Sequence, residues 1–236
     1  MVWLHGGGYI GGSLKQDDPA CIQYVRETDI AIVSVDYRFA PEHPFPAALK
    51  DCYTALKWVH ANAAQLGIDP ERIAIGGESA GGGLAAALAQ LACDRKEVRP
   101  IFQLLIYPML DDRTCTRTDL VDHGFLMWSQ ASNRFGWESY LGKDCFAANT
   151  PPHSVPARRV DLSGLPPAWV GVGTLDLFHD EDVTYARRLK ESGVPCDLYI
   201  VQGAFHGFDM AGTQLKVVQE FRKSQVAALK NHLLGN

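Results

Sequence analysis

Short uninterrupted apolar runs recur along this chain of 236 residues, and stretches with a helical pattern lie between them. Runs that are continuous rather than alternating are typical of strands buried on both faces. We expect strands at residues 2–4, 30–35, 72–75, 101–107, 168–172 and 197–201, and helices at residues 47–65, 82–93, 180–192 and 214–234. This alternation predicts an α/β fold with a mostly parallel central sheet and helices on both faces.

The stretch from 111 to 162 breaks the alternation. It holds no run that predicts a buried strand, but it is rich in large apolar side chains: Phe125, Leu126, Met127, Trp128, Phe135, Trp137 and Tyr140. An insertion between two strands can lie over the strand ends as a lid, and pockets are lined by such residues. Alternatively, these aromatics only pack one or two helices onto the body. We therefore expect a single domain over 1–236 with a lid or cap insertion at 111–162.

The composition excludes several classes of partner. The formal net charge of -5 and the lack of a stripe of Lys and Arg give no reason to expect nucleic acid. No apolar stretch approaches the ~20 residues that cross a bilayer, and the start has no basic region followed by an apolar block. The six cysteines are scattered without short pairings, so we expect reduced thiols in a soluble, cytoplasmic protein.

The segment Gly77-Glu78-Ser79-Ala80-Gly81 follows one expected strand and precedes a helix rich in small residues. Strand, sharp turn and helix form the context of a nucleophile elbow, which holds a serine hydroxyl out at the carboxyl edge of a sheet. The glycines are needed because side chains beside the strained turn would collide. A plain turn is the alternative, but the context favours Ser79 as a nucleophile.

A serine hydroxyl is a weak nucleophile unless a base accepts its proton, and the base needs an acid to fix its tautomer. In this architecture the chain order is serine, then aspartate or glutamate, then histidine, in loops after later strands. Asp176 follows the expected strand at 168–172, and His206 lies in a glycine-flanked loop after the strand at 197–201. The sequence therefore predicts Ser79, Asp176 and His206 as a catalytic triad.

Asp176 has rivals in Asp180, Glu181 and Asp182. We assign these three to the first turn of the following helix, where the exposed amides and the helix dipole favour carboxylates. With His179 they resemble a metal cluster, but consecutive residues point in different directions, so we expect no metal. No positional argument favours the remaining histidines outside the glycine loop: His43, His60, His123, His153, His179 and His232.

The first expected strand runs into His5-Gly6-Gly7-Gly8. Residues without side chains let backbone amides approach an acyl carbon, where they stabilise the oxygen that becomes negative, and one further donor is the amide after the nucleophile, here Ala80. We expect His5 to order this loop rather than to transfer protons.

The same loop also matches a dinucleotide fingerprint, because Gly6-x-Gly8-x-x-Gly11 follows a strand and Asp36 ends the next one. In that motif the third glycine lies within a helix packed on the strand, whereas residues 12–19 delay any helix here. The motif also leaves Ser79, Asp176 and His206 unexplained, so we disfavour nucleotide binding.

The chain resembles the hormone-sensitive-lipase-like esterases, also described as bacterial lipolytic family IV, over nearly all of its length. The resemblance rests on HGGG at 5–8, DYRFAPEHPFPAA at 36–48, GESAGG at 77–82, Asp176 with Asp180-Glu181, and HGF at 206–208. It implies an α/β-hydrolase fold, the triad Ser79, Asp176 and His206, and oxyanion donors at Gly7, Gly8 and Ala80. It also implies no cofactor and frequent dimers.

Two features depart from this resemblance. Glu78 stands where many relatives have Asp, which alters the pocket wall but leaves the turn intact. The chain also lacks the residues that relatives usually carry ahead of the glycine loop, where they form early strands and two covering helices. We expect a shortened form with an open acyl site and an uncovered apolar edge. Such surfaces favour association, so we expect a homo-oligomer, most simply a dimer.

The predicted function is hydrolysis of short to medium acyl esters through a serine acyl-enzyme, with a small-molecule ester as partner. A non-catalytic small-molecule receptor on the same fold is one alternative, although an intact His206 argues against it. Amide, carbamate or deacetylase chemistry on the same triad is another. A nucleotide-binding oxidoreductase is the remote one.

Overall fold

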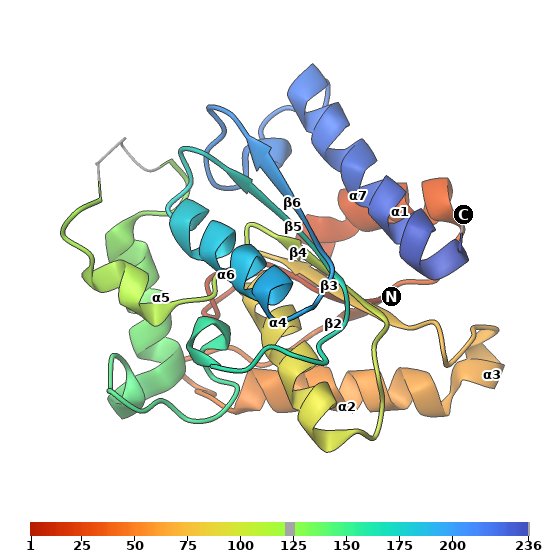
Figure 1. The fold of residues 1–236 in the computed structure, drawn as a ribbon, viewed down its shortest axis with the longest axis horizontal. Coiled ribbons are helices and arrows are strands. Elements are labelled where there is room, and N and C mark those ends of the chain that lie inside the picture. The colour runs from red at the N-terminus through yellow and green to blue at the C-terminus, as the bar shows by residue number, and fades with distance from the viewer. Residues whose placement is uncertain (121–125, 236) are drawn as a thin grey trace.

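A computed structural model describes residues 1–120 and 126–235, and its centre is one parallel sheet (Figure 1). The strands are β1 (Val2–Leu4), β2 (Val33–Val35), β3 (Ala74–Glu78), β4 (Phe102–Ile106), β5 (Ala168–Gly173) and β6 (Cys196–Val201). Their order across the sheet is β2-β1-β3-β4-β5-β6, and every neighbouring pair is parallel. All six expected strands are therefore present, although β2 is shorter than the predicted range.

The helices are α1 (Asp18–Thr28), α2 (Ala47–Ala61), α3 (Ala63–Leu66), α4 (Ala80–Arg95), α5 (Gln130–Leu141), α6 (His179–Glu191) and α7 (Lys216–Leu234). The predicted helix at 47–65 is in fact two helices, α2 and α3, separated at Asn62. Helix α1 was not expected, because only Tyr24 and Thr28 on it are buried and its apolar pattern is weak. Its start did carry a signal, since Pro is favoured in the first turn of a helix.

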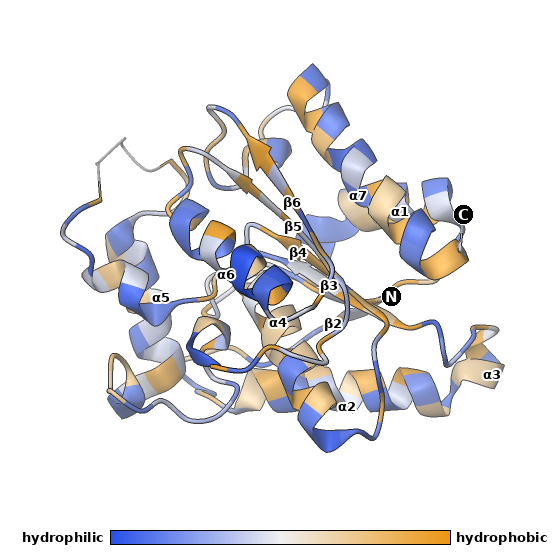
Figure 2. Cartoon of the chain, in the orientation of Figure 1, coloured by the Kyte–Doolittle hydropathy of each residue, from blue (hydrophilic) through white to orange (hydrophobic). Residues whose placement is uncertain are grey.

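Helices cover both faces of the sheet, as expected. Helices α1 and α7 lie side by side on one face, and α2, α4 and α6 cover the other (Figure 1). Two apolar cores result, one around Trp3, Trp169 and Phe221 and the other around Leu88 and Leu105. The strands are largely apolar along their length, while polar residues mark the outer sides of the helices (Figure 2). Within the described residues, no helix has the length and apolar content to cross a membrane.

The sheet has a switch point between β1 and β3. From β1 the chain moves outward to β2, and then returns through α2 to β3 on the other side of β1. Leu4 pairs with Gly77, so the carboxyl ends of the two strands are nearly level. Ligands bind in the crevice that such a reversal opens at the carboxyl ends of parallel strands. The expected glycine loop follows β1 and the expected elbow follows β3, so both lie at this switch point.

Between β4 and β5 the chain makes a long excursion, and the insertion predicted at 111–162 lies within it. Its described elements are the 3₁₀ turns η2 (Asp112–Thr116), η3 (Gly142–Asp144) and η4 (Pro156–Arg158), together with α5. Phe125, one of the aromatics singled out above, lies outside the described residues. The excursion is therefore built on one regular helix, and other contacts must fix it to the body.

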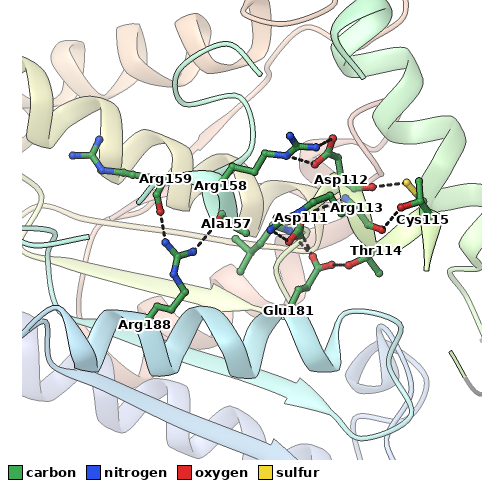
Figure 3. A network of polar contacts seen from close by, with 12 residues as sticks. Asp111, Asp112, Arg113, Thr114, Cys115, Ala157, Arg158, Arg159, Glu181 and Arg188 are labelled. Atoms are coloured by element: carbon green, nitrogen blue, oxygen red, sulfur yellow. Dashed lines mark hydrogen bonds and ion pairs between the residues drawn. The ribbon is translucent and has the colours of Figure 1, made fainter. Parts of the chain in front are cut away.

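Glu181, near the start of α6, fixes the beginning of the excursion (Figure 3). Its carboxylate accepts hydrogen bonds from the amides of Leu110 (2.7 Å) and Asp111 (3.1 Å) and from the hydroxyl of Thr114. Burial raises the pKa of Glu181, and these donors oppose that rise. The excursion is thereby tied to α6 where it leaves β4.

Two arginines fix the far end of the same excursion (Figure 3). Arg188 on α6 donates to the carbonyl oxygens of Ala157 (2.5 Å) and Arg159. Arg158 forms two hydrogen bonds of 2.7 Å with the fully buried Asp112. Paired contacts of an arginine fork are geometrically specific, so they hold η2, η4 and α6 in one arrangement.

Candidate active site

Ser79 lies at the sharp turn between β3 and α4. Its backbone has φ 54° and ψ -122°, a region that residues with a side chain rarely occupy. The turn is fixed because the amide of Ser79 donates to the carbonyl of Ile106 (2.9 Å) and its carbonyl accepts from the amide of Met109 (2.9 Å). This is the strand, turn and helix context that the sequence indicated.

The glycines beside Ser79 are required by close backbone approach. A Cβ on Gly77 would lie 2.5 Å from the carbonyl oxygen of Leu4, and a Cβ on Gly81 would collide with the same oxygen. Leu4 is the last residue of β1, directly before the glycine loop. The small residues of the elbow therefore let the nucleophile turn sit against the start of that loop.

The structure brings Ser79, Asp176 and His206 together. His206 Nε2 lies 2.9 Å from Ser79 Oγ, and His206 Nδ1 lies 2.9 Å from Asp176 Oδ2. The other oxygen of Asp176 accepts a hydrogen bond from the amide of Phe178 (2.9 Å). The three residues are each at most 7% exposed. A serine, an imidazole and a carboxylate in this sequence of contacts can move a proton from the hydroxyl to the ring.

Two aromatic rings hold the imidazole of His206 edge-on. Its centroid lies 4.8 Å from that of Tyr107 and 5.0 Å from that of Phe178. Tyr107 also donates a hydrogen bond of 2.8 Å to Asp209, three residues after the histidine. Sequence reasoning did not identify Tyr107, although its place directly after β4, at the same sheet edge as Ser79, was a usable signal.

The predicted oxyanion donors lie in the loop after β1 and at the first residue of α4, directly after Ser79. Among the described residues, no backbone or side-chain acceptor engages the amides of Gly7, Gly8 and Ala80, so they are available to a substrate. Ala80 is the first residue of α4, where amides have no partner within the helix. Their role as oxyanion donors stays a prediction and is taken up as a proposal below.

His5 orders the loop, in agreement with the sequence reading. Its Nδ1 lies 2.7 Å from the carbonyl oxygen of Gly6, and its ring stacks on Tyr37 with centroids 4.4 Å apart. The hydroxyl of Tyr37 donates to the carbonyl of His5 (2.6 Å). His5 is fully buried, so it supports the loop from behind.

The excursion at 111–162 contacts the glycine loop directly. Trp128 packs its ring against Gly8, where a Cβ would meet the indole Cζ2 at 2.8 Å. Tyr9 stacks on the buried Tyr140, with centroids 4.2 Å apart. Phe135, by contrast, is 56% exposed. Some aromatics of the excursion are therefore packed and others are exposed. The sequence did not indicate that Trp128 would contact Gly8, an expected oxyanion residue.

The acidic residues after Asp176 have different roles from one another. Asp180 is exposed and paired with Arg117 (2.7 Å), as a helix-start carboxylate should be. Glu181 and Asp182 lie in the same first turn, as expected, but both are buried. The reading of these two as ordinary helix-start charges is therefore incomplete. Burial raises the pKa of Asp182 well above its usual range, and neither of its carboxyl oxygens has a described partner.

The local structure after the glycine loop does not support the hypothesis that this loop binds a dinucleotide. After Gly11 the chain forms a 3₁₀ turn at Leu14–Asp17, and α1 begins only at Asp18. The third glycine is therefore not packed within a helix, as a pyrophosphate site requires.

Comparison with known proteins agrees with this geometry. A profile described as alpha/beta hydrolase fold matches residues 1–210. The chain belongs to this family.

Several characterised relatives are similar over most of the chain. Carboxylesterase NlhH of Mycobacterium tuberculosis is 38% identical over 236 residues, which cover 99% of this chain and 73% of NlhH. Ethyl acetate hydrolase of Pseudomonas putida is 34% identical, again over 99% of this chain and 73% of the relative. Carboxylic ester hydrolase LipN of Mycobacterium tuberculosis is 38% identical over 88% of this chain, but the match spans only 56% of LipN.

Solved structures show the same similarity. A bacterial heroin esterase superposes with a TM-score of 0.93 at 38% identity, covering 98% of this chain and 74% of the esterase. Esterase LipW from Mycobacterium marinum gives a TM-score of 0.89 at 40% identity, covering 98% of this chain and 72% of LipW. The α/β-hydrolase fold expected from the sequence, and the resemblance to esterases, are confirmed.

Proposed function

We propose that the chain hydrolyses carboxylic esters of short to medium acyl length through an acyl-enzyme on Ser79. The observation that carries the proposal is the contact chain from Ser79 Oγ to His206 Nε2 and from His206 Nδ1 to Asp176, both 2.9 Å. Membership of the family and relatives described as carboxylesterases support the same reaction. His206 in place beside Ser79 favours catalysis over a receptor that only binds its ligand.

In the first half of the reaction, Ser79 Oγ attacks the ester carbonyl carbon and His206 Nε2 accepts the hydroxyl proton. A tetrahedral intermediate forms, the bond to the alcohol oxygen breaks, and the imidazolium returns its proton to the leaving alcohol. Asp176 keeps Nδ1 protonated and stabilises the imidazolium without itself taking the proton. In the second half, water replaces the alcohol in the same sequence and releases the acid and free Ser79.

The amides of Gly7, Gly8 and Ala80 are proposed to bind the oxygen that becomes negative in each half of the reaction. Fixed donors of this kind need no reorganisation when charge develops, and one donor contributes about 3 kcal/mol to the transition state. Trp128 packs on Gly8 and so helps to fix one of these donors. The excursion at 111–162 is on this view a wall of the acyl site as well as a packing element.

The function is tested with p-nitrophenyl esters of increasing acyl length, with a p-nitroanilide of the best acyl group beside them. We expect kcat/KM to be highest among the short and medium acyl groups and the anilide to be cleaved far more slowly, because an amine is the poorer leaving group. Absence of ester hydrolysis at every length would contradict the proposal. Faster cleavage of the anilide would instead favour amide chemistry on the same residues.

We also propose a homodimer in the cytoplasm. Exposed apolar side chains of the excursion support association, since Leu126 and Met127 are 58% and 67% exposed. The six cysteines are all unpaired thiols, which suits a reducing compartment. Light scattering should give about twice the chain mass of 25.9 kDa, and a mass of one chain across the concentration range would contradict the dimer.

A further inference from the structure

Glu78 places a carboxyl group directly behind the glycine loop. It is the last residue of β3 and precedes Ser79 in the elbow, and it is only 6% exposed. Its Oε1 lies 3.3 Å from the position that a Cβ would occupy on Gly6. Gly6 adjoins Gly7, one of the proposed oxyanion donors. The charge state of Glu78 therefore matters at the place where the substrate oxygen becomes negative.

The buried Asp17 is a second acid that acts on Glu78. Asp17 Oδ2 accepts a hydrogen bond from Trp3 Nε1 (2.7 Å), which stabilises a negative charge on Asp17. That charge raises the pKa of Glu78. A charged Asp17 therefore favours the neutral form of Glu78.

Tyr107 gives the same assignment from the other side. Its hydroxyl oxygen lies 2.8 Å from Asp209 Oδ1 and 3.3 Å from Glu78 Oε2. A phenol has one proton, and the shorter contact with Asp209 takes it. Asp209 also has a cation close by, since Arg222 lies 3.7 Å from its other oxygen. Asp209 therefore keeps the charge, and Glu78 meets the phenol oxygen as a neutral acid.

The surroundings of Glu78 contain no compensating cation in direct contact among the described residues. The titratable and charged groups that face it come from six elements: Asp17 on η1, Cys21 and Tyr24 on α1, Tyr37 after β2, Tyr107 after β4, Asp209 on the 3₁₀ turn η5 (Phe208–Met210), and Arg222 of α7 behind Asp209. Burial, then the charges of Asp17 and Asp209, raise the pKa of Glu78 well above its usual range.

We propose that Glu78 is a positioning residue held as a neutral acid, so that no negative charge lies behind the oxyanion loop during ester hydrolysis. The inference rests on the function proposed above, because it concerns the charge that develops in that reaction. A neutral Glu78 can donate its proton to the phenol oxygen of Tyr107, which lies 3.3 Å from Oε2. An ionised Glu78 would repel both Asp17 and the tetrahedral oxyanion, and the loop would lose the arrangement that serves the transition state.

The first test compares kcat as a function of pH for the parent, Glu78→Gln and Glu191→Gln. Gln is the neutral isostere, so Glu78→Gln should retain most of the parental kcat at neutral pH. The parent should lose kcat on the alkaline side, by about tenfold per pH unit once Glu78 ionises, and Glu78→Gln should lack this limb. Glu191→Gln makes the same change at a surface acid of α6 that pairs with Arg187 (2.9 Å), so it should keep the limb. A limb unchanged in Glu78→Gln, or removed by Glu191→Gln, would overturn the proposal.

A second test does not depend on turnover and therefore separates this inference from the proposed function. The infrared band of protonated carboxyl groups is recorded at neutral pH for Ser79→Ala and for Ser79→Ala/Glu78→Gln. We expect the band to lose intensity in the double variant. An identical band in both proteins would show that Glu78 is ionised and would overturn the proposal even if esters are hydrolysed.

A third test of a neutral Glu78 is the pH dependence of the free energy of unfolding. When folding raises the pKa of an acid, the folded protein keeps the proton over a pH range in which the unfolded protein has lost it. The free energy of unfolding therefore falls as pH rises above the pKa of the unfolded state, about 4.3, and stops falling once pH passes the pKa of the folded state. In that pH range, the ratio of the unfolding equilibrium constant of the parent to that of Glu78→Gln should rise by up to about tenfold per pH unit. Equal slopes would contradict the proposal.

Discussion

Replacing Ser79 by alanine is expected to lower kcat by about 10⁵- to 10⁶-fold, or about 7 to 8 kcal/mol, with little change in KM. The substitution removes only the hydroxyl group, so His206 Nε2 loses Ser79 Oγ, which lies 2.9 Å away in the parent. Without it no acyl-enzyme forms, and the residual rate comes from the oxyanion donors and from substrate binding. Initial rates with the best p-nitrophenyl ester measure the effect.

The control for this variant is Ser163→Ala, which removes a hydroxyl from an exposed residue on the loop before β5. We expect parental kcat from it. Circular dichroism and thermal unfolding should show that Ser79→Ala is folded, because alanine keeps the same strained backbone as serine at φ 54°. Parental turnover in folded Ser79→Ala would mean that another group attacks the ester.

Replacing Asp176 by asparagine is expected to lower kcat by about 10⁴-fold while KM changes little. The carboxamide of asparagine preserves the size of the side chain. Its oxygen can still accept a hydrogen bond from the backbone amide of Phe178, which lies 2.9 Å from Asp176 Oδ1 in the parent. It does not hold His206 in the tautomer with a proton on Nδ1, and it does not stabilise the imidazolium. Steady-state kinetics on the same ester series measure the loss.

Asp180→Asn is the matched control, since Asp180 is a neighbouring acid that pairs with Arg117 at the surface. Exposed ion pairs contribute little, so both activity and stability should stay close to the parent. If Asp180→Asn were the damaging change and Asp176→Asn the mild one, the assignment of the acid would be wrong.

The elbow was predictable because its requirements are local. A strand that runs through Gly77 to Glu78, a serine at the turn and small residues entering α4 are all visible in consecutive residues. The close approach of Gly77 and Gly81 to Leu4 explains why those two residues must be small. Asp176 and His206 were predictable for a different reason. Parallel strands end at one sheet edge, so loops after β5 and β6 reach the same place as the elbow after β3.

The parts that were not predicted depend on contacts between distant segments. Glu181 reads as a helix-start charge, and only the fold shows that its carboxylate receives the amides that follow β4. The contact of Glu78 with Tyr107, and that of Trp128 with Gly8, likewise join segments far apart in the sequence. Helix α1 was missed because it buries few residues, so hydrophobic periodicity gave little signal.

The most direct measurement of the central proposal is covalent labelling with a p-nitrophenyl alkylphosphonate. Attack by Ser79 Oγ on phosphorus releases p-nitrophenolate and leaves a stable phosphonate ester that resembles the tetrahedral intermediate. Peptide mass spectrometry should place one adduct per chain on Ser79, with loss of ester turnover in proportion to labelling and strongly slowed labelling in His206→Ala. An adduct on another residue, or full turnover in a chain labelled at Ser79, would contradict the account.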